Sequence, residues 1–345
     1  MKYCFQLLPH ANSHYRHAQE LLGAHEMICL LSSLGVEAPV ETREIGGSMF
    51  FVFECPELAQ PQLKRLLQHS SLLLVATEEG GLLRPLTASR EDYFPRDLSE
   101  MLKYKGKTSA TFTRMLINLS LAAAGISSPG GKTTVLDPLC GRGTTCFCAL
   151  EMGLNSVGID VDKNDLNEIM NFYSRYMTYG HFKHRVKQSS ETCGKKSVPA
   201  AELICAPDKA AYLKEDTRSL RLYLADTGLT APLMRKRPAD VLVADLPYGV
   251  QHGPQEESRK GSLEGMLNRV LPLWREGVRK GGAMALSFNT LTLKKEKLAA
   301  LAENAGWRVL KEEAWYENSH FVEQAVTRDL IVAVNDGQIL GRNQP

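Results

Sequence analysis

The sequence has no long apolar run. No hydrophobic segment approaches the roughly 18 consecutive apolar residues that a membrane-spanning helix needs. Residues 1–9 contain too short an apolar stretch, and no small-residue cleavage site, to predict a secretory signal peptide. The eight cysteines form no C-x-x-C pair, which is typical of reduced thiols. These absences together predict a cytoplasmic protein.

A strong net charge is also absent. The 41 lysines and arginines and the 39 aspartates and glutamates leave a formal net charge of +2. Nucleic-acid binding therefore cannot be inferred from charge alone. For each short basic cluster we expect a solvated loop, and a phosphate contact is the alternative. The clusters are Lys103/Lys105/Lys107, Lys183/Arg185/Lys187, Arg235/Lys236/Arg237 and Arg259/Lys260.

Two phosphate-binding motifs are incomplete. The segment GGKT at 130–133 looks like the end of a P-loop, but Ile126 stands where that motif has its first glycine, and the segment precedes a strand instead of following one. The loop CGRG at 140–143 lacks the third glycine of the dinucleotide fingerprint, because Cys146 holds that place. We therefore expect the GGKT segment to be a turn and not a phosphate-binding P-loop, and a dehydrogenase is disfavoured.

The sequence does contain two strand-like stretches that each end in a carboxylate. Residues 133–145, TTVLDPLCGRGTT, combine a β-branched apolar run, Asp137, a Gly-x-Gly turn and the start of an apolar helix. Residues 240–249, DVLVADLPYG, end a second apolar run in Asp245-Leu-Pro-Tyr. A strand, a glycine loop and a helix N-terminus form the cofactor side of a doubly wound α/β domain. We therefore predict a Rossmann-like doubly wound sheet.

The N-terminal region has the element order β-α-β-β-α-β, which predicts a small ferredoxin-like α+β domain. The expected elements are residues 2–8, 17–34, 40–45, 48–55, 57–69 and 71–77. The predicted division of the chain is 1–88 for this domain, 89–105 for a linker and 106–345 for the larger domain, with a polar insertion at 178–210. Four soft ligands in the insertion match no common zinc spacing, so we expect a loop without a metal: His181, His184, Cys193 and Cys205.

Four aspartates follow or end expected strands of the larger domain. The expected strands are 134–138, 156–159, 213–218 (the end of the third), 240–244 and 283–288, with an antiparallel pair at 308–316 and 325–334. The aspartates are Asp137, Asp160, Asp216 and Asp245. They should meet at the carboxyl edge of the sheet, where ligands bind. For Asp160, the alternative is that it caps the next helix.

These acids favour a cofactor that presents amines and hydroxyls over one rich in phosphate. S-adenosylmethionine fits, since its ammonium, ribose diol and adenine amine are hydrogen-bond donors. The Asp-Leu-Pro-Tyr stretch suits transfer to an exocyclic amine, whose lone pair is delocalised into the base. Asp245 and a backbone carbonyl next to Pro247 can hold the amine hydrogens, and Tyr248 can stack on the base. The alternative is a plain strand followed by a turn.

Both motifs resemble those of class I methyltransferases that act on exocyclic amines. More narrowly, the chain resembles the THUMP-associated RNA methylases, whose members include tRNA guanosine-N2 methyltransferases. The segment YKGKTS at 104–109 is similar to the one that these enzymes place against the methionine end of the cofactor. The resemblance covers roughly residues 95–335, and the first 88 residues look like the N-terminal domain that accompanies the family.

The resemblance implies a role for each matched position. The residues that would hold the target base are Asp245, Leu246, Pro247 and Tyr248. The residues that would bind the cofactor are Thr108 and Ser109 (its carboxylate), Asp137 (its ammonium), Pro138, Cys140, Gly141, Gly143 and Thr144 (the loop), Asp160 and Val161 (its ribose), and Asp216 and Thr217 (its adenine). No metal is implied.

The implied function is S-adenosylmethionine-dependent methylation of the exocyclic N2 of a guanosine in tRNA, with RNA as the partner of a monomeric protein. Leu246 stands where the family more often has proline, and the segment 78–105 is too short to hold a THUMP domain. Three alternatives therefore stay open: methylation of adenine N6 or cytosine N4 in DNA, methylation of a protein or small molecule, and a non-catalytic RNA-binding protein. An accessory subunit also stays open. The basic residues of the 178–210 insertion suggest contact with RNA.

Overall fold

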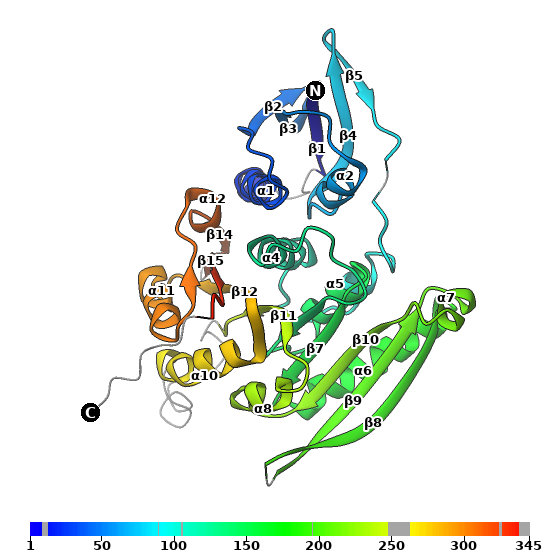
Figure 1. The fold of residues 1–345 in the computed structure, drawn as a ribbon, viewed down its shortest axis with the longest axis vertical. Helices are drawn as coiled ribbons and strands as arrows, with labels where there is room; N and C mark the ends of the chain where they lie inside the picture. The colour runs from blue at the N-terminus through cyan, green and yellow to red at the C-terminus, as the bar shows by residue number, and fades with distance from the viewer. Residues whose placement is uncertain are drawn as a thin grey trace.

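The fold is described from a computed structural model. It covers residues 1–8, 13–88, 90–104, 106–194, 196–247, 263–323 and 326–337. These residues form two separate β-sheets with their helices (Figure 1). Three predicted features lie outside the described residues: Tyr248, Lys105 and the Arg259/Lys260 cluster. Among the described residues, no helix has the length and apolar composition needed to cross a membrane.

The N-terminal sheet has five antiparallel strands in the order β2-β3-β1-β4-β5. Its elements are β1 (Lys2–Leu7), α1 (Ser13–Ser33), β2 (Glu41–Ile45), β3 (Ser48–Glu54), α2 (Gln60–Leu66), β4 (Leu72–Glu79) and β5 (Leu82–Pro85). Alternate side chains of β1 and β3, such as Phe5 and Phe51, pack with α1 and α2 into one apolar cluster. The ferredoxin-like order is confirmed, and β5 is an additional edge strand.

The N-terminal unit docks on the rest of the chain through α1, α2 and helix α4 (Ala110–Ala123). The contact is polar at its centre. The Arg65 guanidinium donates to Asn118 Oδ1 (2.7 Å), and Asn118 Nδ2 donates to Glu26 Oε1 (2.7 Å). All three side chains are buried. Because every buried polar group in this network needs its partner, the network defines one docked arrangement of the two sheets.

The larger sheet has ten strands in the order β13-β15-β12-β11-β6-β7-β10-β9-β8, with β14 paired to β15. Its strands are β6 (Thr134–Asp137), β7 (Asn155–Asp160), β8 (Lys183–Cys193), β9 (Lys196–Ala206), β10 (Arg218–Leu224), β11 (Ala239–Asp245), β12 (Val278–Asn289), β13 (Arg308–Val309), β14 (His320–Glu323) and β15 (Val326–Val334). The further helices are α3 (Leu98–Met101), α5 (Thr144–Glu151), α6 (Lys163–Tyr179), α7 (Lys209–Leu213), the 3-10 helix η1 (Thr227–Leu229), α8 (Thr230–Met234), α10 (Leu263–Gly277), α11 (Lys295–Asn304) and α12 (Glu313–Tyr316).

The central five strands β10, β7, β6, β11 and β12 are parallel, and helices cover both of their faces. Along β11, Val241 and Val243 point toward α4 and α5, whereas Leu242 and Ala244 point toward α10. This continuous apolar pattern is what a strand buried on both faces requires. The order of the strands reverses between β6 and β11, which is where a doubly wound sheet opens its ligand crevice. The predicted fold is confirmed.

Two expected elements differ in the structure. The 178–210 insertion, expected to be a loop, is a β-hairpin: β8 and β9 pair over their full length, and β9 continues the sheet antiparallel to β10. The third strand, expected to end at Arg218, begins there, because the apolar side chains that the sheet buries are Leu220, Leu222 and Tyr223. The final strands are antiparallel as predicted, although β13 contains only two residues.

Candidate active site

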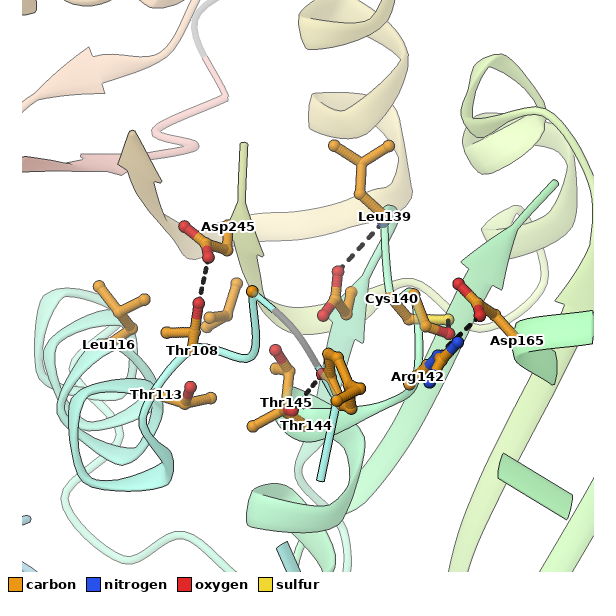
Figure 2. A pocket seen from close by; sticks show the side chains of 15 residues that line it. Thr108, Thr113, Leu116, Leu139, Cys140, Arg142, Thr144, Thr145, Asp165 and Asp245 are labelled. Carbon is orange, nitrogen blue, oxygen red and sulfur yellow. Dashed lines mark hydrogen bonds and ion pairs between the residues drawn. The ribbon is translucent and has the colours of Figure 1, made fainter. Parts of the chain in front are cut away.

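A cavity of about 480 Å³ opens at the carboxyl ends of β6 and β11 (Figure 2). It brings together the glycine loop after β6, the start of α5, the end of β11, and α4 with the segment before it. Its lining is Tyr104, Gly106, Thr108, Thr113, Leu116, Asp137, Leu139, Cys140, Gly141, Arg142, Thr144, Thr145, Asp165, Val243 and Asp245. Among the described residues, no group of three or more His, Cys, Asp or Glu side chains could hold a metal ion.

The glycine loop closes one side of the cavity. The Gly143 N–H donates to the Cys140 carbonyl (2.7 Å), which makes a tight turn, and Gly141 and Gly143 have φ of +47° and +80°. Non-glycine residues rarely adopt these positive φ values. A Cβ atom on Gly143 would also lie 3.0 Å from Ile169, whereas one on Gly141 would meet nothing within 4 Å. The backbone at Gly141 is therefore open to close approach by a ligand.

Asp137 is a buried carboxylate on the cavity wall, with 4% of its surface exposed. Its Oδ1 accepts the Leu139 N–H (3.1 Å). The pKa of Asp137 is raised to about 7, chiefly by burial and also by the charges of Asp160 and Asp245, while hydrogen bonds from Thr145 and Leu139 oppose the shift. A cation placed beside this carboxylate would favour its ionised form. The wall is therefore suited to an ammonium group.

Asp160 ties the end of β7 to the glycine loop. Its Oδ2 accepts the Gly141 N–H (2.8 Å), and its Oδ1 accepts the Asp162 N–H (2.9 Å). The alternative that Asp160 caps the next helix is wrong, because Asp162 caps α6 by accepting the Asn164 N–H (2.7 Å). The neighbouring Val161 is 67% exposed, so an apolar surface stands beside the carboxylate.

The prediction that Asp216 lies at the carboxyl edge is wrong, and Thr217 shares the error. Both residues precede β10 and therefore lie at the amino edge of the sheet, where Asp216 pairs with Arg218 (2.6 Å). The carboxylate that follows this strand is Asp226. It accepts the Gly228 N–H (2.8 Å) and lies 2.9 Å from the Arg269 guanidinium, whose hydrogen bond lowers the pKa of Asp226.

Asp245 ends β11 on the opposite side of the cavity. The Thr108 hydroxyl donates to one of its oxygens, and the Ser287 hydroxyl donates to the other (the first is drawn in Figure 2). Ser287 lies beside Asp245 because β11 and β12 pair in that register. The guanidinium of Arg328 lies 3.5 Å from the Thr108 hydroxyl. Sequence reasoning missed Ser287 and Arg328, since neither belongs to a local motif.

The residues after Asp245 have two different environments. The Leu246 side chain is buried in the core, and its N–H donates to the Ser287 carbonyl (2.8 Å). Pro247 is exposed. Because Tyr248 lies outside the described residues, its stacking role stays a prediction.

The segment before α4 crosses over the glycine loop. The Tyr104 hydroxyl hydrogen-bonds to Thr144 Oγ1 (2.7 Å), and the Arg142 guanidinium lies 5.2 Å from the centre of the Tyr104 ring. Arg142 in turn pairs with Asp165 (2.9 Å). Ser109 is exposed at the start of α4.

The structure thus gathers six predicted site residues around one cavity: Thr108, Asp137, Cys140, Gly141, Thr144 and Asp245. A second group adjoins these residues in the chain or at the neighbouring strand end without lining the cavity: Ser109, Pro138, Gly143, Asp160, Val161, Leu246 and Pro247. The roles of both groups stay predictions. The fold and the cavity define the class as a Rossmann-like α/β protein with an acidic cavity at its topological switch point.

No protein-family model matches the chain, and no curated protein matches it. Among solved structures, TrmN from Thermus thermophilus is similar at 16% identity and a TM-score of 0.40, over 89% of this chain and 64% of that one. A methyltransferase homolog protein from Pyrococcus horikoshii is similar at 12% identity and a TM-score of 0.38, over 97% and 87%. Magnesium protoporphyrin IX methyltransferase from Synechocystis, solved with bound S-adenosylmethionine, is similar at 12% identity and 0.35, over 67% and 86%. The chain spans less than two thirds of the TrmN structure.

Proposed function

We propose that this protein is an S-adenosylmethionine-dependent RNA methyltransferase that acts on an exocyclic base amine, the N2 of a guanosine in tRNA. The observation that carries the proposal is the juxtaposition of Asp245 with the glycine loop and Asp137 around one cavity. The motifs of the chain resemble those of methyltransferases, and the similar structures include proteins named as methyltransferases. The proposal includes a catalytic domain at 106–345, joined by 89–105 to an N-terminal domain at 1–88.

The residues of the cavity fit this cofactor. When bound, S-adenosylmethionine supplies a methyl group activated by a sulfonium. Asp137 would hold the ammonium, the open backbone at Gly141 would allow close approach, and the Asp160 carboxylate would accept from the ribose hydroxyls, with Val161 as the apolar surface beside them. The acid that follows the third strand, β10, is Asp226, and its carboxylate would accept a hydrogen bond from the adenine amine.

Asp226 and Asp216 provide a matched pair for testing this part of the proposal. Asp226→Ala should weaken cofactor binding by about tenfold, because it removes a charged acceptor at the carboxyl edge. Asp216→Ala should leave the affinity unchanged, because that residue lies at the other edge of the sheet. Calorimetric titration of both variants with S-adenosylmethionine measures the difference. Equal affinities for the two variants would contradict the placement of the adenine.

Asp245 would act on the acceptor base. The hydroxyls of Thr108 and Ser287 orient this carboxylate at the end of β11, where it would accept hydrogen bonds from a base amine. Holding these hydrogens would direct the nitrogen lone pair toward the methyl group, and Asp245 would take the proton that the nitrogen loses once the methyl group has passed from the sulfonium sulfur to the nitrogen. Positioning and hydrogen bonding supply the protein's share of catalysis.

The test is transfer of tritiated methyl from S-adenosylmethionine to total tRNA from a strain that lacks this protein. The product should contain N2-methylguanosine after digestion to nucleosides. Asp245→Asn should lose at least about a hundredfold of the rate, since it removes the charged acceptor, and should keep cofactor affinity. A parallel reaction contains DNA in place of tRNA. Label in adenine or cytosine of the DNA, with none in tRNA, would reject the RNA substrate and leave the proposed transfer to a base amine standing. No cofactor binding by the wild-type protein would reject the whole proposal.

A further inference from the structure

The β8–β9 hairpin extends the large sheet beyond β10, and its two faces differ. Helix α6 packs on one face, where Val186 and Leu203 join the apolar cluster around Tyr173 (Figure 1). On edge strand β8 the next residues in the alternation are Lys183, Arg185 and Lys187, and all three are exposed. Because side chains alternate between the faces of a strand, these three basic residues form a row on the face opposite α6. We call this row the basic strip.

The acidic residues near the basic strip have other partners. Glu202 lies opposite Lys187 in the β8–β9 register, but Arg221 on the next strand binds it at 2.9 Å. Glu191 accepts a hydrogen bond from the Tyr223 hydroxyl (2.9 Å). Among the described residues, none of the three basic side chains of the strip forms an ion pair. The strip therefore presents three positive charges to solvent.

We propose that the basic strip binds the phosphate backbone of the substrate RNA, an inference that rests on the proposed function. Alternate residues of a strand are spaced by about 7 Å, so Lys183 and Lys187 are about 13 Å apart on one straight edge. An extended row of single charges fits an extended polyanion, since a small phosphate ligand would need donors that converge on one point. The strip lies on a sheet extension outside the cavity that holds the proposed cofactor site, so docking there leaves the site open to a base.

The variant K183Q/R185Q/K187Q tests the proposal, with K297Q/R308Q/K311Q as its matched control. The control removes the same charge from the other end of the sheet, where each residue has an acidic partner: Glu264, Asp336 and Glu303. Binding of total tRNA is measured by filter retention between 50 and 300 mM KCl. Cofactor affinity and thermal melting are measured in parallel for every variant.

The hairpin variant should lower the slope of log K against log salt by about 2 to 3, because each lost phosphate contact contributes about 0.7 to 0.9. At 0.1 M salt this corresponds to a loss of up to about 500-fold in affinity. The control should keep the wild-type slope, and both variants should keep cofactor affinity and the wild-type melting temperature.

Three results would overturn the inference. An unchanged slope in the hairpin variant would mean that the strip only protects an edge strand from pairing with other chains, and that variant should then aggregate. Equal losses in both variants would mean that only net charge matters. If the wild-type protein bound anionic phosphatidylserine vesicles more tightly than tRNA, and the hairpin variant lost that binding, the partner of the strip would be a lipid surface. Methyl transfer to tRNA with an unchanged slope would reject the strip and keep the proposed function.

Discussion

Replacing Asp137 by asparagine should stabilise the cofactor-free protein above neutral pH while preventing cofactor binding. Burial raises the pKa of Asp137 from 3.8 to about 7, so the folded protein binds one more proton than the unfolded chain between these values. The stability that this proton provides is present below pH 4 and is lost as the pH rises to 7. A shift of about 3 pKa units corresponds to about 4 kcal/mol at pH 8. Asparagine has nearly the same shape and does not ionise, so the variant should gain most of this amount.

The assay is thermal unfolding of the wild-type and Asp137→Asn proteins at pH 5, 6, 7 and 8 without cofactor. The two melting temperatures should differ by only about 3 °C at pH 5, where about 1.5 kcal/mol has been lost, and by roughly 8 °C at pH 8, at about 2 °C per kcal/mol for a large domain. Asp226→Asn is the control of opposite sign: the pKa of Asp226 is lowered, so its neutralisation should give no stabilisation at pH 8. A difference between Asp137→Asn and wild type that does not grow with pH would refute the reasoning.

The affinity of the wild-type protein for the cofactor should also depend on pH through Asp137. If the ammonium binds to ionised Asp137, affinity should fall about tenfold per pH unit below pH 7, because binding must then release the proton of the carboxyl group. Calorimetry in buffers of different ionisation enthalpy measures that proton. Affinity that is flat from pH 5 to pH 8 would remove Asp137 from the cofactor site.

Three further predictions concern packing and orientation. Ser287→Ala should lower kcat of methyl transfer about tenfold with unchanged cofactor affinity, because the proposed catalytic carboxylate of Asp245 loses the hydroxyl donor on one of its oxygens; a change confined to cofactor affinity would contradict this. Gly158→Ala should cost about 1–3 kcal/mol in urea unfolding, since its Cβ would lie 2.8 Å from the Cys140 sulfur, and a neutral result would mean that the thiol can move aside. Asn118→Leu should cost about 1–3 kcal/mol, because it removes the side-chain acceptor of the buried Arg65 Nη1 and the donor to Glu26; a loss below 1 kcal/mol would show that the docked network is dispensable.

The parts of the site that the sequence predicted are those encoded by one continuous segment. The strand, Asp137, the Gly-x-Gly turn and the start of α5 follow one another within residues 134–151, so one local pattern predicts their order and the positive φ of the two glycines. Ser287 differs because it approaches Asp245 only through the register of two strands 42 residues apart. That register depends on which apolar faces the helices bury, and this cannot be read from either strand alone.

The error at Asp216 has a physical cause that also explains the hairpin. A polar segment such as 183–193 does not look like a strand, because β8 lies at the edge of the sheet and much of its surface meets solvent. Because the sequence does not predict the hairpin, no predicted element between α6 and β10 locates the start of the third strand. The sequence pattern therefore predicts this strand too close to the N-terminus. The burial of Leu220 and Leu222 corrects the position, since β10 lies between β7 and β9 and packs these two side chains into the apolar cluster with α6. In a doubly wound sheet an acidic residue therefore predicts a ligand contact only once the preceding apolar run has been placed in the sheet.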